Sequence, residues 1–491
     1  MRLNCNSKSN KALKIIFQIS FVVSPIHPRV SLGNSALRVI RERRTRMDKI
    51  TKSAVAVLFV FGLLLLLPLD ALAVPSFQRQ TGYNCAQCHT VFPELTPFGR
   101  AFKMGGYVLT KAGKQEQWVP PIAAMVQASY TEQKGLSNKV DPFDDSPDAK
   151  TNLPQQASLF YAGKIIDHLG AFSQLTYDGV SNNLFLDNTD IRYANSVSLG
   201  DTNLVYGATL NNNPTVQDVW NTTPAWRFPW ATSAVAVTPA ASPVINGVLA
   251  QQVGGIGVYG FWNDLIYGEV ALYRSNQKGL TRPLSAGTTV SPVTNNEVPY
   301  WRLALQHQWG PNSLEVGTYG IVADIYPGDA TSGQTDRFID TAFDAQYQYI
   351  SGKHIFSLQS TWIHENQIWN ASFPLGNTSN RSDFLNTFRG NANYYYKSSI
   401  GTIGGILGYF TTTGSTDPVL YAPQETTGSQ TGSPNSNGFI LEAVYMPWDK
   451  WKFALQYTIY NKFNGAHTNY DGFGRNASDN NTLYALVWIA F

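Results

Sequence analysis

The last stretch of the 491-residue chain reads Thr482-Leu483-Tyr484-Ala485-Leu486-Val487-Trp488-Ile489-Ala490-Phe491. Successive side chains of an extended strand point to opposite sides, so every second residue of this stretch shares a face. One of the two faces carries only apolar side chains, those of Leu483, Ala485, Val487, Ile489 and Phe491. The pattern predicts a β-strand with a face that contacts an apolar environment.

Short alternating segments of the same kind recur throughout residues 119–491. This part of the chain has no long apolar run, few charged residues, and many Tyr, Phe, Trp, Asn, Thr, Ser and Gly residues. Weak alternation of this type is the signature of outer-membrane strands. We predict sixteen strands, at residues 119–131, 156–165, 169–179, 187–198, 202–212, 250–261, 264–275, 298–309, 312–324, 336–350, 353–366, 384–397, 399–412, 436–447, 451–462 and 480–491.

The connections between these strands alternate in length. Turns such as Asp167-His168, Gly310-Pro311 and Trp448-Asp449-Lys450 are followed by loops that are mostly longer and polar. Outer-membrane barrels combine short periplasmic turns with long extracellular loops, and an even strand number leaves both ends of the barrel on the periplasmic side. We therefore predict an all-β transmembrane fold, an antiparallel barrel of about sixteen strands, in contact with the lipid of the cell outer membrane.

The terminal Phe491 is similar to the recognition signal of outer-membrane barrel assembly, which is an aromatic residue at the end of an alternating strand. A soluble β-sandwich is the alternative fold. It would need two packed sheets, and it offers no reason for a terminal phenylalanine.

Alternation also assigns side chains to the lipid or to the lumen. In the first strand it places Met125 in the lumen, among Gln127, Ser129 and Thr131. We expect the loop at 213–249, which holds three tryptophans, to narrow or cap the pore. The same rule places seven charged residues in the lumen, as any porin would have: Asp190, Arg192, Arg302, Asp340, Asp344, Arg389 and Glu442.

The first 73 residues are expected to be absent from the mature protein. Residues 1–46, with ten Lys or Arg and one acidic residue, are interpreted as a mis-called upstream extension. Residues 47–73 resemble a signal peptide, with an apolar run at 54–67 and the cleavage box Ala71-Leu72-Ala73. A retained transmembrane anchor is the alternative, but the apolar run is short for a membrane span.

Removal of this leader changes the charge of the chain. The whole sequence has a formal net charge of +3, and residues 1–73 hold 12 of its 36 basic and 3 of its 33 acidic residues. The remaining 24 basic and 30 acidic residues leave a net charge of −6. A basic surface for a polyanion is therefore missing, and we exclude nucleic acid as a partner.

The sequence Cys85-Ala86-Gln87-Cys88-His89 matches C-x-x-C-H, the attachment signature of c-type haem. The two cysteines form thioethers with the haem vinyl groups, and the histidine is the proximal ligand of the iron. A zinc site, which would need further ligands nearby, and a thioredoxin-like redox pair are the alternatives. We predict one covalent haem c, held by Cys85, Cys88 and His89.

Residues 74–118 are too few to form an independent haem domain. Within them we predict a short helix, capped by Thr96, with Pro97 in its first turn and glycines at its end. Phe98 and Phe102 share a face of this helix, which packs either on the haem or on the barrel wall. The expected product is a partly helical cytochrome c segment that plugs the lumen of the barrel at 119–491.

The segment around the motif resembles the outer-membrane fused monohaem cytochrome–porins of iron-oxidising bacteria. The resemblance is dense over about thirty residues and is one of architecture beyond them. It departs from the family at Met104, where leucine is more usual. The matching residues are Phe77-Gln78-Arg79-Gln80-Thr81-Gly82, Cys85 to His89, Phe92-Pro93-Glu94-Leu95-Thr96-Pro97-Phe98-Gly99-Arg100, Phe102-Lys103 and Gly106-Tyr107.

The resemblance implies an Fe(II)-oxidising cytochrome, an oxidoreductase that takes electrons from extracellular Fe(II) and passes them to a periplasmic cytochrome c or blue-copper protein. Two alternatives stay open. The chain could be a solute porin with a structural or regulatory haem, or a cytochrome–porin that serves another extracellular donor.

A methionine opposite the histidine would raise the haem potential, as Fe(II) oxidation requires. Three methionines remain after residue 73, at Met104, Met125 and Met446. Met446 falls near a periplasmic turn, and Met104 points away from the aromatic face of its helix. We therefore predict Met125 as the distal ligand, with Met104 as the second choice; the alternative is that Met125 only fills space.

Overall fold

The structure is a computed structural model, and it describes residues 75–109, 120–136, 147–277, 290–328 and 332–491, together with residues 280, 282, 284 and 330. The predicted extension at 1–46 and signal peptide at 47–73 lie outside the described residues, as do residues 74 and 110–118 of the predicted cytochrome segment. No helix among the described residues is long and apolar enough to cross a membrane.

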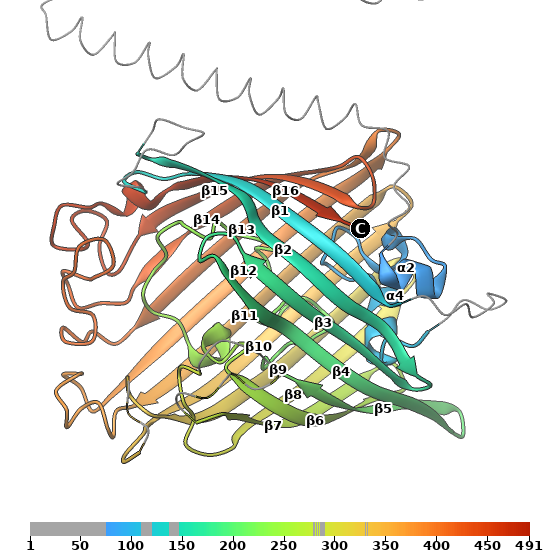
Figure 1. The fold of residues 1–491 in the computed structure, drawn as a ribbon, viewed down its shortest axis with the longest axis horizontal. Helices are drawn as coiled ribbons and strands as arrows, with labels where there is room; N and C mark the ends of the chain where they lie inside the picture. Colours follow the sequence, from blue (N-terminus) through green and yellow to red (C-terminus); the bar gives the residue numbers. More distant parts are fainter. Residues whose placement is uncertain are drawn as a thin grey trace, which may run out of the picture. The chain divides into compact units, whose positions relative to one another are not determined.

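Sixteen antiparallel strands form one closed barrel (Figure 1). Each strand pairs with its neighbours in the sequence, and β1 closes the ring by pairing with β16 from Met125 opposite Ala490 to Glu132 opposite Leu483. The predicted fold class and all sixteen predicted strands are confirmed. The strands are β1 (Ile122–Glu132), β2 (Ala149–Ile166), β3 (Leu169–Asp178), β4 (Asn183–Leu199), β5 (Thr202–Asn211), β6 (Val253–Trp262), β7 (Ile266–Ser275), β8 (Val298–Trp309), β9 (Asn312–Ile325), β10 (Asp336–Ser351), β11 (His354–Ile368), β12 (Ser382–Ser398), β13 (Gly401–Gly414), β14 (Ser436–Met446), β15 (Trp451–Lys462) and β16 (Thr482–Ala490).

Two strands begin four or more residues earlier than predicted, and each of them contains a bulge. β2 starts at Ala149 rather than at residue 156. Its pairing with β1 is interrupted by a bulge that contains Pro154 and lies opposite Ala128, and it continues beyond this bulge to Ala149. A proline is tolerated at such a bulge because no ladder hydrogen bond is lost there. β4 starts at Asn183 rather than at residue 187, and its bulge contains Asp187 and Asn188.

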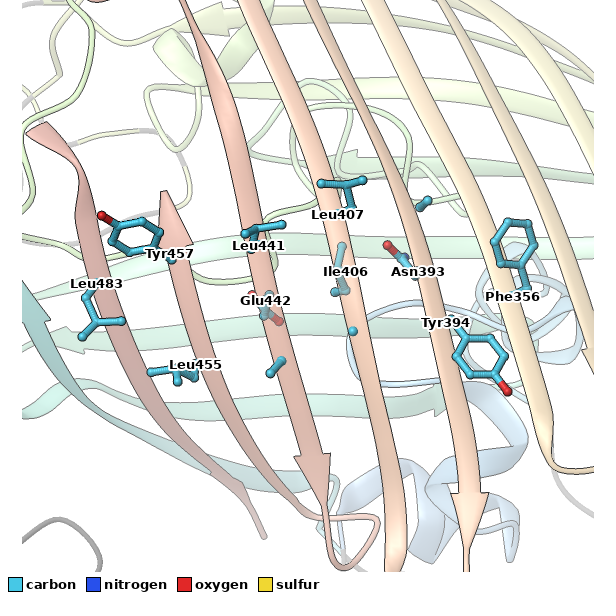
Figure 2. Close-up of a pocket in the computed structure, with 13 residues that line it drawn as sticks. Phe356, Asn393, Tyr394, Ile406, Leu407, Leu441, Glu442, Leu455, Tyr457 and Leu483 are labelled. Atoms are coloured by element: carbon cyan, nitrogen blue, oxygen red, sulfur yellow. The ribbon is translucent and has the colours of Figure 1, made fainter. Parts of the chain in front are cut away.

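The outer face of the barrel is apolar. On β6 and β7 the outward Ile256 is 64% exposed and the outward Val270 57%, whereas the inward Tyr259 is only 5% exposed. Across β11–β16, outward side chains such as Leu407, Leu441 and Tyr457 line a shallow apolar groove of about 520 Å³ (Figure 2). A continuous apolar wall of this kind on a closed barrel belongs in a lipid bilayer, so the chain is an outer-membrane barrel.

The inner face is polar and the lumen is filled. Met125, Gln127, Ser129 and Thr131 are buried inside the barrel, as alternation predicted. The loop at 213–249 folds inward as expected, and Trp220 is fully buried, with its Nε1 donating to Gln306 on β8 at 2.8 Å. This loop contains the short π-helix η1 (Val244–Val248), and the loop before β16 contains the 3-10 helix η2 (Ala477–Asn480).

The N-terminal segment contributes three short helices, α2 (Ser76–Thr81), α3 (Cys85–Cys88) and α4 (Pro97–Met104). Figure 1 shows α2 and α4 at the end of the barrel where the chain terminates. The predicted caps of α4 are confirmed, because the Thr96 side chain accepts a hydrogen bond from Gly99 N at 3.1 Å and the helix ends at Gly105.

Glycines in the wall make room for inward aromatic rings. A Cβ added at Gly255 on β6 would overlap the ring of Tyr273 on β7, a fully buried side chain. We expect Gly255→Ala to lower the free energy of unfolding by about 1–3 kcal/mol, because overpacking forces the ring or the backbone to move. Urea unfolding of the detergent-solubilised barrel, followed by tryptophan fluorescence, measures the change.

Gly268→Ala on β7 is the matched control, because nothing lies within 4 Å of the added Cβ. If both variants lose the same stability, the cost belongs to the loss of glycine itself and not to the overlap with Tyr273.

Candidate functional site

The motif cysteines lie on α3, a single helical turn. Residues three apart on a helix share a face, so Cys85 and Cys88 present their sulfur atoms on the same side. His89 leaves the helix with extended backbone angles, and its N–H donates to Cys85 O at 2.9 Å. Both cysteines are free thiols. The turn therefore presents two sulfur atoms and one imidazole next to each other.

Helix α4 holds this turn in place. The N–H of Thr96 donates to Cys88 O at 2.9 Å, and its hydroxyl donates to Gln87 O at 2.6 Å. Gly99 lies directly over the motif, where any Cβ would collide with the Cys88 carbonyl. Only glycine permits this close approach of the two backbones.

The motif borders an internal cavity of about 460 Å³. This volume is within the range of small-molecule and cofactor sites. Cys85, Cys88 and His89 all line it, together with Met125 from the first strand and tryptophans of the inward loop. Three elements that are distant in sequence thus enclose one space: the N-terminal segment, the strands β1–β4 and the loop at 213–249.

His89 is half-buried beside the motif cysteines. Burial lowers the pKa of its imidazole, against the smaller opposing effect of the Pro93 and Glu94 carbonyls, so the ring is neutral. A neutral imidazole is the form that binds metal. Its buried Nδ1 makes no hydrogen bond of good geometry, although those two carbonyls are close enough to act on the ring.

The surroundings of both thiols disfavour the thiolate. Burial raises the pKa of Cys85 to about 11, and the charge of Asp449 adds to the effect. Burial and the neighbouring Cys85 likewise raise the pKa of Cys88 to about 11. Zinc binding and thiol–disulfide exchange both use thiolates, which such sites stabilise by lowering the pKa. In the described part of the chain, no group of three His, Cys, Asp or Glu side chains forms a metal site.

Of the three methionines in the described residues, Met125 is the one that lines the cavity. It is 6% exposed and lies on β1 opposite Ser158 and Ala490. Met104 packs elsewhere, with Trp220 and Tyr259, and Met446 lies in a separate apolar cluster.

Aromatic rings form part of the lining. Phe102 lines the cavity and packs edge-on against Phe77, with their ring centroids 4.9 Å apart. Phe77 also stacks on Tyr107 at 5.6 Å. Phe98, expected to share this role, packs instead against Tyr83 at 5.0 Å and does not line the cavity.

Arg100 anchors the N-terminal segment to the barrel wall. It is 1% exposed and donates to Gln346 at 2.9 Å, Gln348 at 3.2 Å and Ser313 at 2.6 Å. Burial lowers its pKa to about 10, which leaves the guanidinium charged at neutral pH. Its direct partners are neutral, so the segment is held by hydrogen bonds to a charged donor, which are stronger than neutral ones.

Lys103 anchors the same helix to the inward loop. Its Nζ donates to the carbonyls of Val216 and Asp218, each at 2.7 Å, and lies 4.8 Å from the ring centroid of Trp226. Burial, and then the nearby Arg192, lower the pKa of Lys103 to about 7. The segment therefore contacts both the wall and the loop through buried cations on one helix.

Four of the seven predicted lumen charges pair with one another. Arg192 pairs with Asp190 at 2.8 Å, and Arg302 pairs with Asp344 at 2.6 Å. The sequence analysis missed several members of these networks, including Asp218 and Glu315 near Arg302, because their pairing depends on which strands and loops meet.

Two charged side chains of the cavity lining were also missed. Asp187 sits in the bulge of β4, and Arg227 lies in the inward loop. Neither forms a salt bridge with a described residue. No local pattern marks them, because each faces the cavity only through the bulge or the inward path of the loop.

The stability of the docked segment should depend on the protonation of Lys103. The pKa of Lys103 falls from 10.5 to about 7 on folding, so between these pH values the unfolded chain binds more protons than the folded chain. Stability therefore rises with pH across this interval. Lys103→Met should remove this rise, as measured by melting temperature against pH.

Lys353→Met, at an exposed turn position, serves as the control and should retain the full pH dependence. A Lys103→Met profile that is parallel to the wild-type profile would contradict the role given to this lysine.

Comparison of the sequence with protein-family models and with characterised proteins finds no match. Comparison of the structure finds outer-membrane channels. In vitro-folded OmpT of Vibrio cholerae matches with a TM-score of 0.40 and 10% identity, over 75% of this chain and 96% of that chain. The channel DcaP of Acinetobacter baumannii matches with a TM-score of 0.41 and 10% identity, over 75% of this chain and 96% of that chain. The anion-selective porin from Comamonas acidovorans matches with a TM-score of 0.39 and 12% identity, over 75% of this chain and 98% of that chain. The barrel fold of this chain rests on its own strand pairing, and the functions of these proteins are not transferred to it.

Proposed function

We propose that this outer-membrane barrel is an electron conduit that oxidises extracellular Fe(II) and delivers the electron to a periplasmic carrier. The observation that carries the proposal is the shared cavity, in which Cys85, Cys88, His89 and Met125 all face one space inside a closed barrel. Two thiols for attachment and a nitrogen and a sulfur ligand are the donor set of a c-type haem of high potential.

The residues present fit such a group. Cys85 and Cys88 would form the thioether links, His89 would be the proximal ligand and Met125 the distal ligand. The cofactor would supply one-electron redox chemistry, and the protein supplies position, ligands and exclusion of water. The rings of Phe77 and Phe102 supply an apolar part of the lining next to the motif.

The cysteine end of the cavity supports delivery to a periplasmic partner. Asp449 lines the cavity and acts on the pKa of Cys85, and it belongs to the short turn between β14 and β15. Short turns of outer-membrane barrels lie on the periplasmic side. A cytochrome c or blue-copper protein that approaches this rim would come close to the attached group.

The filled lumen favours electron transfer over solute passage. The inward loop and the N-terminal segment contact each other through Lys103, and Asn221 accepts a hydrogen bond from Leu95 N at 2.9 Å. An unplugged barrel of sixteen strands would leave an aqueous channel. A passage closed in this way suits a protein that moves electrons across the membrane.

Asp187 is the carboxylate that we propose to receive Fe(II). It accepts hydrogen bonds from Thr176 and Gln251, at 3.1 and 3.2 Å, but no cationic side chain in the described part of the chain pairs with it. Of the other cavity carboxylates, Asp218 pairs with Arg302 and Asp449 lies at the periplasmic turn. Carboxylate oxygen is a suitable donor for Fe(II), and a half-buried carboxylate without a counter-charge favours a cation while staying within reach of solvent.

The Met125 assignment predicts a spectroscopic loss. Met125→Leu should abolish the far-red charge-transfer absorption of a methionine–haem bond and lower the reduction potential, because a methionine ligand raises it. Visible spectra and redox titration of the purified oxidised protein measure both.

Met104→Leu and Met446→Leu are the matched controls and should leave the band intact. If the band survives in Met125→Leu and disappears in Met104→Leu, the distal ligand is Met104 instead.

The proposed function predicts fast reduction by Fe(II). Mixing Fe(II) with the air-oxidised protein in a stopped-flow instrument should reduce the haem rapidly, while planar bilayers show no open-channel conductance. Asp187→Asn should slow reduction by Fe(II) several-fold, because it removes the charged oxygen donor, and leave reduction by dithionite unchanged.

An open channel with a haem that Fe(II) does not reduce would replace this proposal with a solute porin. Equal slowing with Fe(II) and dithionite in Asp187→Asn would show a structural effect and remove Asp187 from the Fe(II) path.

A further inference from the structure

Arg227 in the inward loop and Arg389 on β12 are cations without an acidic partner. Neither forms a salt bridge with a described residue, whereas Arg192 and Arg302 in the same lumen do. The Nη1 of Arg227 and the Nε of Arg389 are buried donors that lack an acceptor. Among the described residues, the Arg227 side chain donates a hydrogen bond to Asn246, and the Arg389 guanidinium carbon lies 6.0 Å from the ring centroid of Phe410.

The two guanidinium groups lie close to each other. Phe228, next to Arg227, packs over Gly408 on β13, and Phe410 on the same strand pairs with Arg389. Burial lowers the pKa of Arg227 to about 9, and the positive charge of Arg389 contributes to the fall. Arg227 and Arg389 are both half-buried, and arginine still holds its proton at neutral pH, so two like charges lie near each other in a place that is only partly open to water. Charges removed from water favour a counter-charge, and none of the described residues supplies one.

A third buried donor lies in the same loop. Trp230, three residues after Arg227, makes no hydrogen bond of good geometry through its Nε1, although the Tyr395 hydroxyl is close enough to interact with it. Both side chains line the cavity that holds the motif cysteines. Donors without acceptors are rare in protein interiors and indicate a missing partner. A ligand that brings anionic oxygen acceptors into this cavity would satisfy them together.

Arg227 and the cysteines line different parts of the cavity. Charges of the periplasmic turn, those of Asp449 and Lys450, act on Cys85. Arg227 instead neighbours Arg389, which lies in the middle of β12. A porphyrin linked to protein through its vinyl groups carries its two propionates on the far edge of the ring. The anionic edge of a group attached at Cys85 and Cys88 would therefore face away from the periplasmic turn.

We propose that Arg227, supported by Arg389 and Trp230, binds a propionate of the haem attached at Cys85 and Cys88. The inference rests on the cofactor in the proposed function and deepens it. Arginine is suited to this role because its planar group donates two parallel hydrogen bonds to a carboxylate. The positive pair would also raise the reduction potential, since cationic charge near the iron disfavours its oxidised form.

The test compares Arg227→Gln and Arg389→Gln with the wild-type protein by resonance Raman spectroscopy and redox titration. Arg227→Gln should shift the propionate bending modes. At a fixed solution potential it should lower the ratio of reduced to oxidised haem about tenfold, or about 59 mV for a one-electron couple. Arg389→Gln should lower this ratio by less, because Arg389 does not line the cavity and acts on the propionate only through its charge near Arg227.

Arg274→Gln is the matched control, because Arg274 is exposed and pairs with Glu297 at 3.0 Å away from the cavity. It should change neither readout. Arg227→Lys keeps the charge, so it should retain most of the potential while still shifting the bending modes. If Arg227→Gln fails to fold, the shift of the propionate bending modes in Arg227→Lys tests the same inference.

Unchanged bending modes in an Arg227→Gln protein with full haem content would overturn the inference and leave the proposed function intact. The arginine pair would instead hold a solvent anion if added inorganic phosphate shifted the wild-type potential saturably and the bending modes did not respond to substitution. A wild-type protein without covalent haem would overturn both the proposed function and this inference.

Discussion

The pairing of β1 with β16 is the interaction on which the rest of the structure depends. In the hydrocarbon core of a membrane no water is available to bond a free strand edge, so a sheet can span only when it closes on itself. Closure makes every outward side chain a lipid contact and every inward one part of the lumen. The apolar outer wall and the polar inner wall follow from this condition, strand by strand.

Closure with sixteen strands also creates a wide interior, and this protein fills it. The loop at 213–249 folds in from one side and the N-terminal segment packs against it and the wall. Buried cations join them, since Arg100 bonds to the wall and Lys103 to the loop. A segment too short to form its own core thus uses the barrel as its core, which relaxes the usual size limit for a stably folded segment.

The cavity is the space left between these three parts. It takes sulfur atoms from the N-terminal segment, a methionine from β1, and tryptophans and an arginine from the loop. Its charges are distributed unevenly, with Asp187 at the bulge of β4 and Arg227 beside Arg389 on the opposite wall. In the proposed function these unpaired charges have distinct ligands, a cation at Asp187 and a propionate at Arg227.

Much of the fold could be predicted from the sequence, because side chains of a membrane-barrel strand alternate between lipid and lumen. The polarity of each residue therefore indicates the face on which it lies. The sixteen strands, the inward position of Met125 and the caps of α4 all depend on such local rules. The C-x-x-C-H motif likewise predicts its ligand from adjacent residues alone. The bulges at Pro154 and Asp187 escaped prediction because they depend on the register with a neighbouring strand.

Only the tertiary structure decided which groups meet. The partners of Arg100 are more than 200 positions away in the sequence, and those of Lys103 more than 100. Whether a charge in the lumen has a counter-charge depends on all the elements around it. The lack of one at Arg227, Arg389 and Asp187 among the described residues therefore cannot be recognised in the sequence. Local periodicity determined the wall of this protein, and long-range packing decided what the wall encloses.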